Sequence, residues 1–149
     1  MAGKYISVGL HLVWSTKGRR QLLARQSERR LKAYIGSVIK SKKGRLIEAG
    51  NEPDHIHLYV SMPSTISIAE LINAIKSNST RWIRRILGRR LFAWQEGYGA
   101  FSVSKSMEQV LIGYIRNQEK HHRRRDFKAE FLELLRRHRV DYDPRYIWD

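Results

Sequence analysis

Two histidines separated by one residue are the part of this sequence most able to do chemistry. His55 and His57 alternate with aliphatic residues in a short run that a proline bounds on each side. Because strand side chains alternate between two faces, both imidazoles should project from one face while the aliphatic residues enter the core. Two neutral imidazoles side by side can hold a divalent metal ion. A half-exposed strand with two polar residues has the same spacing, so these positions alone leave both interpretations open.

A tyrosine and a glutamine four residues apart offer complementary groups. Tyr114 and Gln118 follow Ser106-Met107-Glu108-Gln109, a capping-box pattern typical of a helix start, and their spacing places them on one helix face. Gln118 could give a metal an oxygen ligand, while Tyr114 presents its phenol to a phosphate held on that ion. A neutral phenol is a weak nucleophile, so it needs such an arrangement to react.

Other tyrosines and histidines compete for these roles. Tyr59 shares the predicted strand face of the histidines, but a rigid strand gives its side chain little freedom to move. His11 alternates outward on the first predicted strand, where it could face the same side or be a structural histidine. The remaining tyrosines and histidines are better explained by a predicted position in the core, in a turn, in the tail or at a helix end. They are Tyr34, Tyr98, Tyr142, Tyr146, His121 and His122.

The elements that must position these residues can be predicted from hydrophobic periodicity and from turn and capping signals. They are a strand over 5–15, a helix over 27–42, strands over 45–51 and 55–62, a helix over 67–88, an interrupted strand over 92–104, a helix over 106–121 and a last helix starting at Asp126. This order predicts an α+β fold, a ferredoxin-like or RRM-like antiparallel sheet with helices on one face. The opposite face would be free for a ligand, and C-terminal helices would carry the tyrosine. Residues 1–149 are expected to form a single domain.

The charge of the chain favours a polyanionic partner. Lys and Arg number 29 against 14 Asp and Glu, a formal net charge of +15, which suits nucleic acid. Trp82, Trp94, Tyr98 and Phe101 could stack on bases. Basic residues along or just after the second predicted helix could line a DNA groove, namely Lys76, Arg81, Arg84, Arg85, Arg89 and Arg90.

The residue types that the sequence lacks narrow the function classes further. The absence of cysteine excludes disulfides, thiolate zinc sites and a cysteine nucleophile. No apolar stretch is long enough to cross a membrane, and the N-terminus lacks a signal-peptide pattern. We therefore expect a soluble, cytoplasmic protein with no membrane partner.

Several strings resemble one protein family. His55-Ile56-His57 resembles the His-hydrophobic-His motif of the HUH nucleases, and residues 114–118 resemble the tyrosine helix of the IS200/IS605-type single-tyrosine transposases. Strings similar to that family recur in its order over nearly the whole chain: HLVWSTK at 11–17, PDHIHL at 53–58, WQEGYGAFSV at 94–103 and NQEKHH at 117–122.

The resemblance implies a metal-dependent transposase that acts on single-stranded DNA. In that family two histidines and a glutamine bind Mg²⁺ or Mn²⁺, so His55, His57 and Gln118 are the expected metal ligands. Tyr114 would attack the scissile phosphate, forming a 5′-phosphotyrosine that the 3′-OH of a second strand resolves. The resemblance also implies hairpin DNA ends as substrate and a homodimer in which one copy's tyrosine helix completes the partner's site.

Two alternatives stay open. A domesticated, repeat-associated tyrosine transposase that cuts hairpin repeats would resemble the family as closely. A non-catalytic RRM-like nucleic-acid-binding module would share the fold, although no RNP-like string is present.

Overall fold

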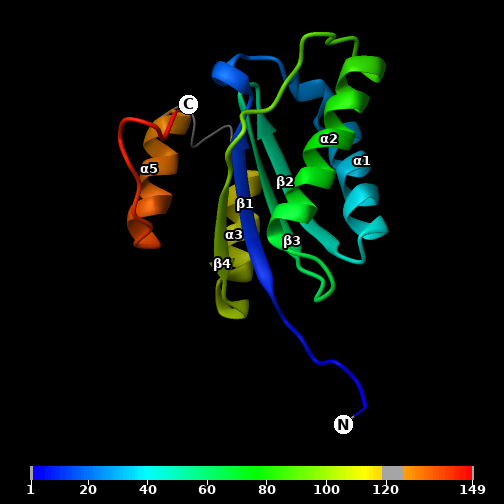
Figure 1. Cartoon of the computed structure of the whole chain (residues 1–149), viewed down its shortest axis with the longest axis vertical. Helices are drawn as coiled ribbons and strands as arrows, with labels where there is room; N and C mark the ends of the chain where they lie inside the picture. The colour runs from blue at the N-terminus through cyan, green and yellow to red at the C-terminus, as the bar shows by residue number, and fades with distance from the viewer. Residues whose placement is uncertain (1, 119–125, 149) are drawn as a thin grey trace.

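A four-stranded antiparallel sheet forms the centre of the protein (Figure 1). The computed structural model describes residues 2–118 and 126–148. The strands are β1 (Gly9–Ser15), β2 (Arg45–Glu52), β3 (His55–Ser61) and β4 (Gly99–Val103). The helices are α1 (Glu28–Ser41), α2 (Ile68–Ile86), α3 (Glu108–Arg116) and α5 (Phe127–Arg137). The sheet order β2-β3-β1-β4, with every neighbour antiparallel, confirms the predicted ferredoxin-like α+β class.

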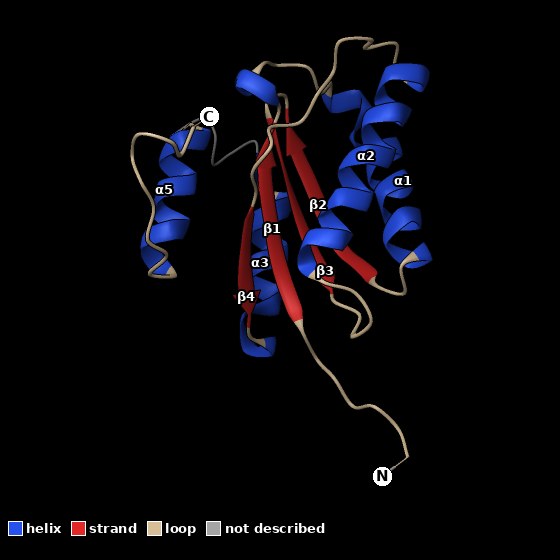
Figure 2. Ribbon diagram, viewed as in Figure 1, coloured by secondary structure: helices blue, strands red, loops and turns tan. Residues whose placement is uncertain are grey.

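The main core lies between the sheet and the helices α1 and α2, which Figure 2 shows together on one side of the strands. Alternation along β1 and β3 sends every second residue into it, as predicted. Leu12, Trp14 and Leu58 are completely buried there. Such side chains each contribute about 1.5–3 kcal/mol of burial free energy, which fixes the register of β3 and therefore which face its histidines occupy.

The opposite face of the sheet is covered, so the expectation of an open face for a ligand is wrong. Helix α3 packs on β2 and β3, and α5 lies beside β4. A second, smaller apolar cluster joins Val13 and Phe101 of the sheet to Phe127 and Leu135 of α5. The amphipathic α5 needs an apolar surface for its aromatic stripe, and the histidine-bearing face supplies it.

Predicted helix starts were correct at two positions and wrong at one. Ser67 Oγ accepts from the Glu70 amide at 3.1 Å, and Asp126 Oδ1 accepts from the Ala129 amide at 3.0 Å. Ser106 is not a helix cap. It lies in a short 3-10 turn (Lys105–Met107) before α3, and its hydroxyl is 3.0 Å from that of Ser104.

The ends of two predicted elements also differ from the structure. The first strand begins at Gly9. The Val8 carbonyl still accepts from the Met62 amide at 2.8 Å, and the chain before it runs away from the sheet toward the N-terminus (Figure 1). The tyrosine helix ends at Arg116, and residues 119–121 of its predicted span lie outside the described residues.

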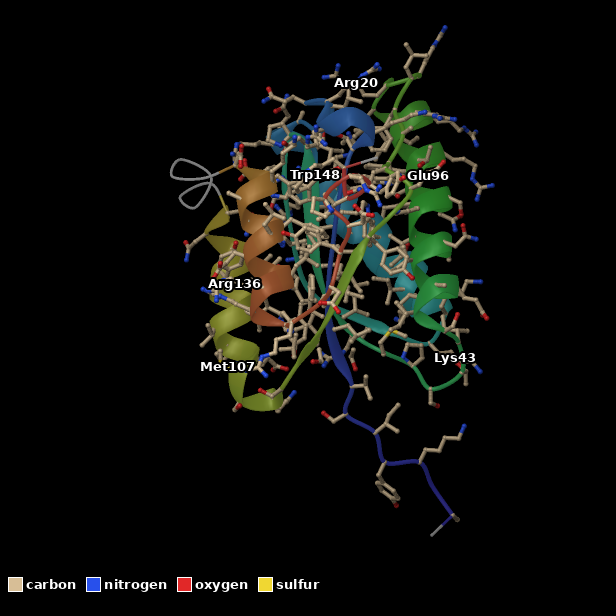
Figure 3. The ribbon with its side chains drawn as sticks, turned by 60° about the vertical axis from the view of Figure 1, so that its left-hand side comes forward. Arg20, Lys43, Glu96, Met107, Arg136 and Trp148 are labelled. Atoms are coloured by element: carbon tan, nitrogen blue, oxygen red, sulfur yellow. The ribbon has the colours of Figure 1, made fainter. Side chains whose placement is uncertain are left out.

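The C-terminal tail packs against α5, where the Trp148 ring lies 6.5 Å from that of Phe127 and 6.2 Å from that of Phe131 (Figure 3). Within the described parts of the chain, no helix combines the length and the apolar composition needed to cross a membrane.

Candidate metal and nucleophile site

The two histidines of β3 lie on one face of the sheet, as the alternation predicts, but neither is exposed. His55 and His57 have no solvent-accessible surface in the described chain. Helices α3 and α5 cover them, so a cation bound here would be surrounded by protein. The interpretation of these residues as a half-exposed strand with two incidental polar groups does not fit this burial.

A carboxylate that the sequence analysis did not identify lies against both imidazoles. Glu130 of α5 is buried, and its Oε1 is 2.8 Å from His57 Nε2 and 3.5 Å from His55 Nε2. One ligand atom from each of these three residues lies within 4.8 Å of the others. Two imidazole nitrogens and a carboxylate oxygen suit a divalent metal, and this cluster could bind one.

A sequence signal for Glu130 does exist. Phe127, Phe131 and Leu134 form the apolar stripe of α5, and Glu130 occupies a position of that stripe, three residues after the first of them. An acidic residue on the inward face of an amphipathic helix is rare unless it is paired, and this one is paired with histidines.

The far nitrogen of each histidine also has a partner. Asp54 Oδ1 lies 2.6 Å from His55 Nδ1, and His11 Nε2 lies 2.8 Å from His57 Nδ1. Metal-binding histidines are commonly held in this way, one ring nitrogen toward the ion and the other toward a fixed acceptor. Burial lowers the pKa of His11 well below its usual range, and the nearby His57 ring lowers it further, so His11 is neutral.

Tyr114 reaches the same cluster. Its hydroxyl donates a hydrogen bond to Glu130 Oε2, and its ring lies edge-on to the His57 ring, with centroids 5.9 Å apart. Glu130 therefore contacts the predicted nucleophile through one oxygen and the predicted metal ligands through the other. Tyr114 is far from His55 and His57 in the sequence, and the fold of a single chain brings it against them.

Three contacts hold the tyrosine helix on the sheet. Gly50, opposite His57 on β2, leaves room for the backbone of Ile115, since a Cβ there would lie 2.8 Å from the Ile115 carbonyl oxygen. At the end of α3, Arg116 Nε donates to the buried carboxylate of Glu48 at 2.7 Å. At its start, the Tyr59 hydroxyl donates to Glu108 Oε2 at 2.6 Å.

Gln118 is buried just beyond the end of α3. Its side-chain amide donates to the carbonyl oxygen of Tyr114 at 3.3 Å, so the two residues remain one turn apart, as their spacing predicts. The oxygen that lies 2.8 Å from His57 Nε2 and 3.5 Å from His55 Nε2 belongs to Glu130. A metal-ligand role for Gln118 stays a prediction.

An open cavity of about 430 Å³ gives access to this cluster from one side. Tyr114 and Glu130 line it together with residues of β4 and of the two helices, which Figure 3 shows side by side. Its wall is mostly apolar, from Val103, Met107, Val110, Leu111 and Leu134. Tyr114, the predicted nucleophile, is therefore reachable even though the histidines behind it are buried.

The competing tyrosines have other partners. Tyr59 is buried and supports α3, while Tyr34 stacks on Trp82 with centroids 5.3 Å apart. Tyr142 and Tyr146 are exposed in the C-terminal tail. His121 and His122 lie outside the described residues.

Several residues proposed for DNA contact are used inside the fold. Trp94 and Phe101 are buried, and the Trp94 indole donates to Ser79 Oγ at 2.9 Å. The Lys76 ammonium donates to three backbone carbonyls of residues 95–97, and burial lowers its pKa to about 8. Helix α2, with its arginines, lies on the face of the sheet opposite the histidines. That arginine cluster is therefore not part of the metal and nucleophile site.

Comparison with known proteins finds transposases that are similar to this chain. Residues 4–118 match the model of the family described as "Transposase IS200 like". The chain is 25% identical over 114 residues to the transposase of insertion sequence IS200 from Salmonella typhimurium, covering 72% of this chain and 74% of that protein. It is 26% identical over 116 residues to the ISDra2 transposase TnpA of Deinococcus radiodurans, covering 72% of this chain and 81% of that protein.

Two solved structures share the fold. A crystal structure of a candidate transposase from Deinococcus radiodurans R1 superposes with a TM-score of 0.64 at 23% identity, over 79% of this chain and 95% of that one. A REP-associated tyrosine transposase bound to a REP hairpin gives 0.60 at 18% identity, over 82% and 73% of the two chains. The matched family model spans β1 to Gln118 and so includes both histidines and the tyrosine: this chain belongs to the IS200-like transposase family.

Proposed function

We propose that this protein cleaves and rejoins single-stranded DNA, with Tyr114 as the nucleophile and a divalent metal held by His55, His57 and Gln118. The observation that supports it most directly is the Glu130 carboxylate, which joins the Tyr114 hydroxyl to the His57 imidazole in a buried cluster. A transposase of this family needs a nucleophile and a cation site side by side, and the contacts of Glu130 with Tyr114 and His57 support that assignment.

The covalent step follows from the chemistry of the phenol. The Tyr114 oxygen forms an ester bond to the scissile phosphorus, and the bond from that phosphorus to the 3′ oxygen breaks. The phenol proton is lost and the leaving oxygen gains one, which gives a 5′-phosphotyrosine and a free 3′-OH. A 3′-OH from a second strand then attacks the same phosphorus and releases Tyr114. Because one ester is exchanged for another, rejoining needs no external energy source.

The neighbours of Tyr114 prepare it for this step. Glu130 fixes the direction of the hydroxyl, and the contacts of α3 with Gly50 and Glu48 fix the position of the helix backbone. When bound, Mg²⁺ or Mn²⁺ would polarise a phosphoryl oxygen and neutralise charge that develops in the transition state. We include Glu130 as a further oxygen ligand, since its Oε1 already faces both histidines.

The DNA partner is proposed to be a hairpin end, and the assembly a homodimer. The solved structure of the REP-associated transposase whose fold this chain shares is bound to a REP hairpin, and the chain carries a net charge of +15. In a homodimer with exchanged tyrosine helices, α3 of one copy would make on its partner the contacts that it makes here on its own sheet. In the structure of the single chain, Tyr114 lies against its own His57.

A repeat-associated enzyme that cuts hairpin repeats remains the second candidate, favoured by the fold shared with the REP-associated transposase. The DNA flanking the coding sequence distinguishes the two, because a mobile element has matching left and right ends. The non-catalytic RRM-like module loses support, because α3 and α5 cover the sheet face on which such modules stack bases.

The test is covalent capture of DNA. Short single-stranded oligonucleotides from the host locus, incubated with Mn²⁺ or Mg²⁺, should give a protein–DNA adduct on a denaturing gel, and peptide mapping should locate it at Tyr114. Tyr114→Phe should abolish the adduct and keep DNA binding, since only one hydroxyl is lost, whereas the exposed Tyr146→Phe should react normally. A wild-type adduct from Tyr114→Phe would refute the nucleophile, and full activity in EDTA would refute the metal requirement.

A further inference from the structure

We infer that His11 is a positioning residue that fixes the imidazole tautomer of His57, so that the Nε2 atom of His57 is available to a cation. The inference rests on the proposed metal site and adds a residue of β1 to it. His11 is 4% exposed, and its Nε2 lies 2.8 Å from His57 Nδ1. The two ring planes are 22° apart, close enough to parallel for the ring nitrogens to face one another.

Strand register explains why this contact is fixed. Val13 is the residue of β1 directly opposite His57, and His11 is two residues away on the same face, the diagonal position. Tyr59 of β3 and Phe101 of β4 flank His11 on either side, and the His11 and Phe101 ring centroids are 6.2 Å apart. The side chain of His11 is thus held by neighbouring strands on both sides.

The tautomer follows from valence. A neutral imidazole carries one proton, so a His57 ring that offers the Nε2 lone pair to a cation must keep its proton on Nδ1. That N–H then points at His11 Nε2, which must accept it. An imidazole whose proton is on Nδ1 has a free lone pair on Nε2, so His11 can accept in this tautomer. An apolar residue at position 11 would leave the Nδ1–H of His57 without this acceptor.

A histidine also suits this place better than a carboxylate. His55 already has the carboxylate of Asp54 on its Nδ1, and Glu130 faces both rings. A second carboxylate beside the buried Glu130 would add another negative charge to a largely buried cluster, where unpaired charge is costly. An imidazole at position 11 supplies an acceptor nitrogen that carries no negative charge.

The experiment is Mn²⁺ binding to the metal-free protein, measured by calorimetry. His11→Leu removes the acceptor and should weaken Mn²⁺ binding about 10- to 100-fold, the usual effect of removing a histidine's hydrogen-bond partner. His11→Gln places an amide oxygen near the same point and should bind close to wild type. The matched control is His138→Leu, a histidine that lines the same cavity and stacks on Phe101, and it should leave Mn²⁺ affinity unchanged.

The outcomes separate this inference from the proposed function. If the wild type does not bind Mn²⁺, or if His57→Ala still binds it, the metal site itself is wrong. If His57→Ala loses binding while His11→Leu binds like the wild type, only the role of His11 is overturned. Should His11→Leu fail to fold, ¹⁵N-imidazole NMR of the Mg²⁺-bound wild type decides. A His11 ring with its proton on Nδ1 and its Nε2 unprotonated toward His57 supports the inference, and a proton on His11 Nε2 overturns it.

Discussion

Replacing Gly50 with alanine tests whether close packing of α3 on β2 sets the position of the tyrosine. A Cβ at Gly50 would lie 2.8 Å from the carbonyl oxygen of Ile115 and 3.0 Å from its Cγ2. The oxygen belongs to the helix backbone and cannot rotate away, so α3 or β2 must retreat by several tenths of an ångström. Overpacking of this kind costs about 1–3 kcal/mol. The melting temperature should therefore fall by roughly 2–4 °C for each kcal/mol of stability lost.

The same displacement should reduce catalysis. Tyr114 is the residue before Ile115, so a retreat of the helix moves its hydroxyl away from the cluster. Because a misplacement of about 1 Å can cost about 100-fold in rate, several tenths of an ångström should slow adduct formation by about tenfold. Thermal unfolding and single-turnover adduct formation, measured on the same preparation, check the two effects together.

Two other glycines provide controls. At Gly36 of α1 an added Cβ would make only an ordinary contact, 3.7 Å from Leu46, and at Gly113 of α3 nothing lies within 4 Å. Both glycines are helical, so each change to alanine should stabilise the protein by about 0.5–1 kcal/mol. If Gly50→Ala matched these variants in stability and adduct yield, close packing at this point would not set the position of α3.

Three further predictions concern the same face of the sheet. Glu130→Gln should weaken Mn²⁺ binding by about tenfold or more. Glu133 is a partly exposed acid one turn along α5, and Glu133→Gln should leave the affinity unchanged. Equal affinities of the two variants in calorimetry would remove Glu130 from the metal site. Tyr59→Phe should lower the free energy of unfolding by about 1 kcal/mol in urea denaturation, because α3 loses a hydrogen bond at its start. If two copies exchange α3, mixing His57→Ala with Tyr114→Phe chains should restore about a quarter of wild-type cleavage, since half the dimers carry one intact site. Confirmed heterodimers without cleavage would place both residues of each site in one chain, as in the structure described above.

Much of the sheet could be predicted because its signals are local. The alternation around His55 and His57 determines which face these residues occupy, whatever packs on it. Ser67 and Asp126 are helix caps because each side chain bonds an amide three residues on, a contact that involves no other element. Such predictions need only neighbouring residues, and the structure confirms them.

The burial of the site could not be predicted in this way. Whether His57 is exposed depends on α5, which begins 70 residues later and packs on the sheet through Phe127 and Phe131. The role of Glu130 depends on the same long-range contact. Likewise, Lys76 belongs to a helix whose other cations are exposed, and only the fold shows that its ammonium binds the backbone of residues 95–97. Periodicity indicates which way a side chain points and not which element it meets.

The distribution of the site along the chain has a consequence during protein synthesis. The cluster draws on β1 for His11, on β3 for the two metal-binding candidates, on α3 for Tyr114 and on α5 for Glu130. A growing chain on the ribosome therefore contains no version of this centre until α5 has emerged, and long-range contacts such as these form late in folding. A fragment that lacks α5 would also lack the surface that buries the histidines. The candidate site of this transposase-family protein is thereby kept incomplete until nearly all of the described chain has been made and folded.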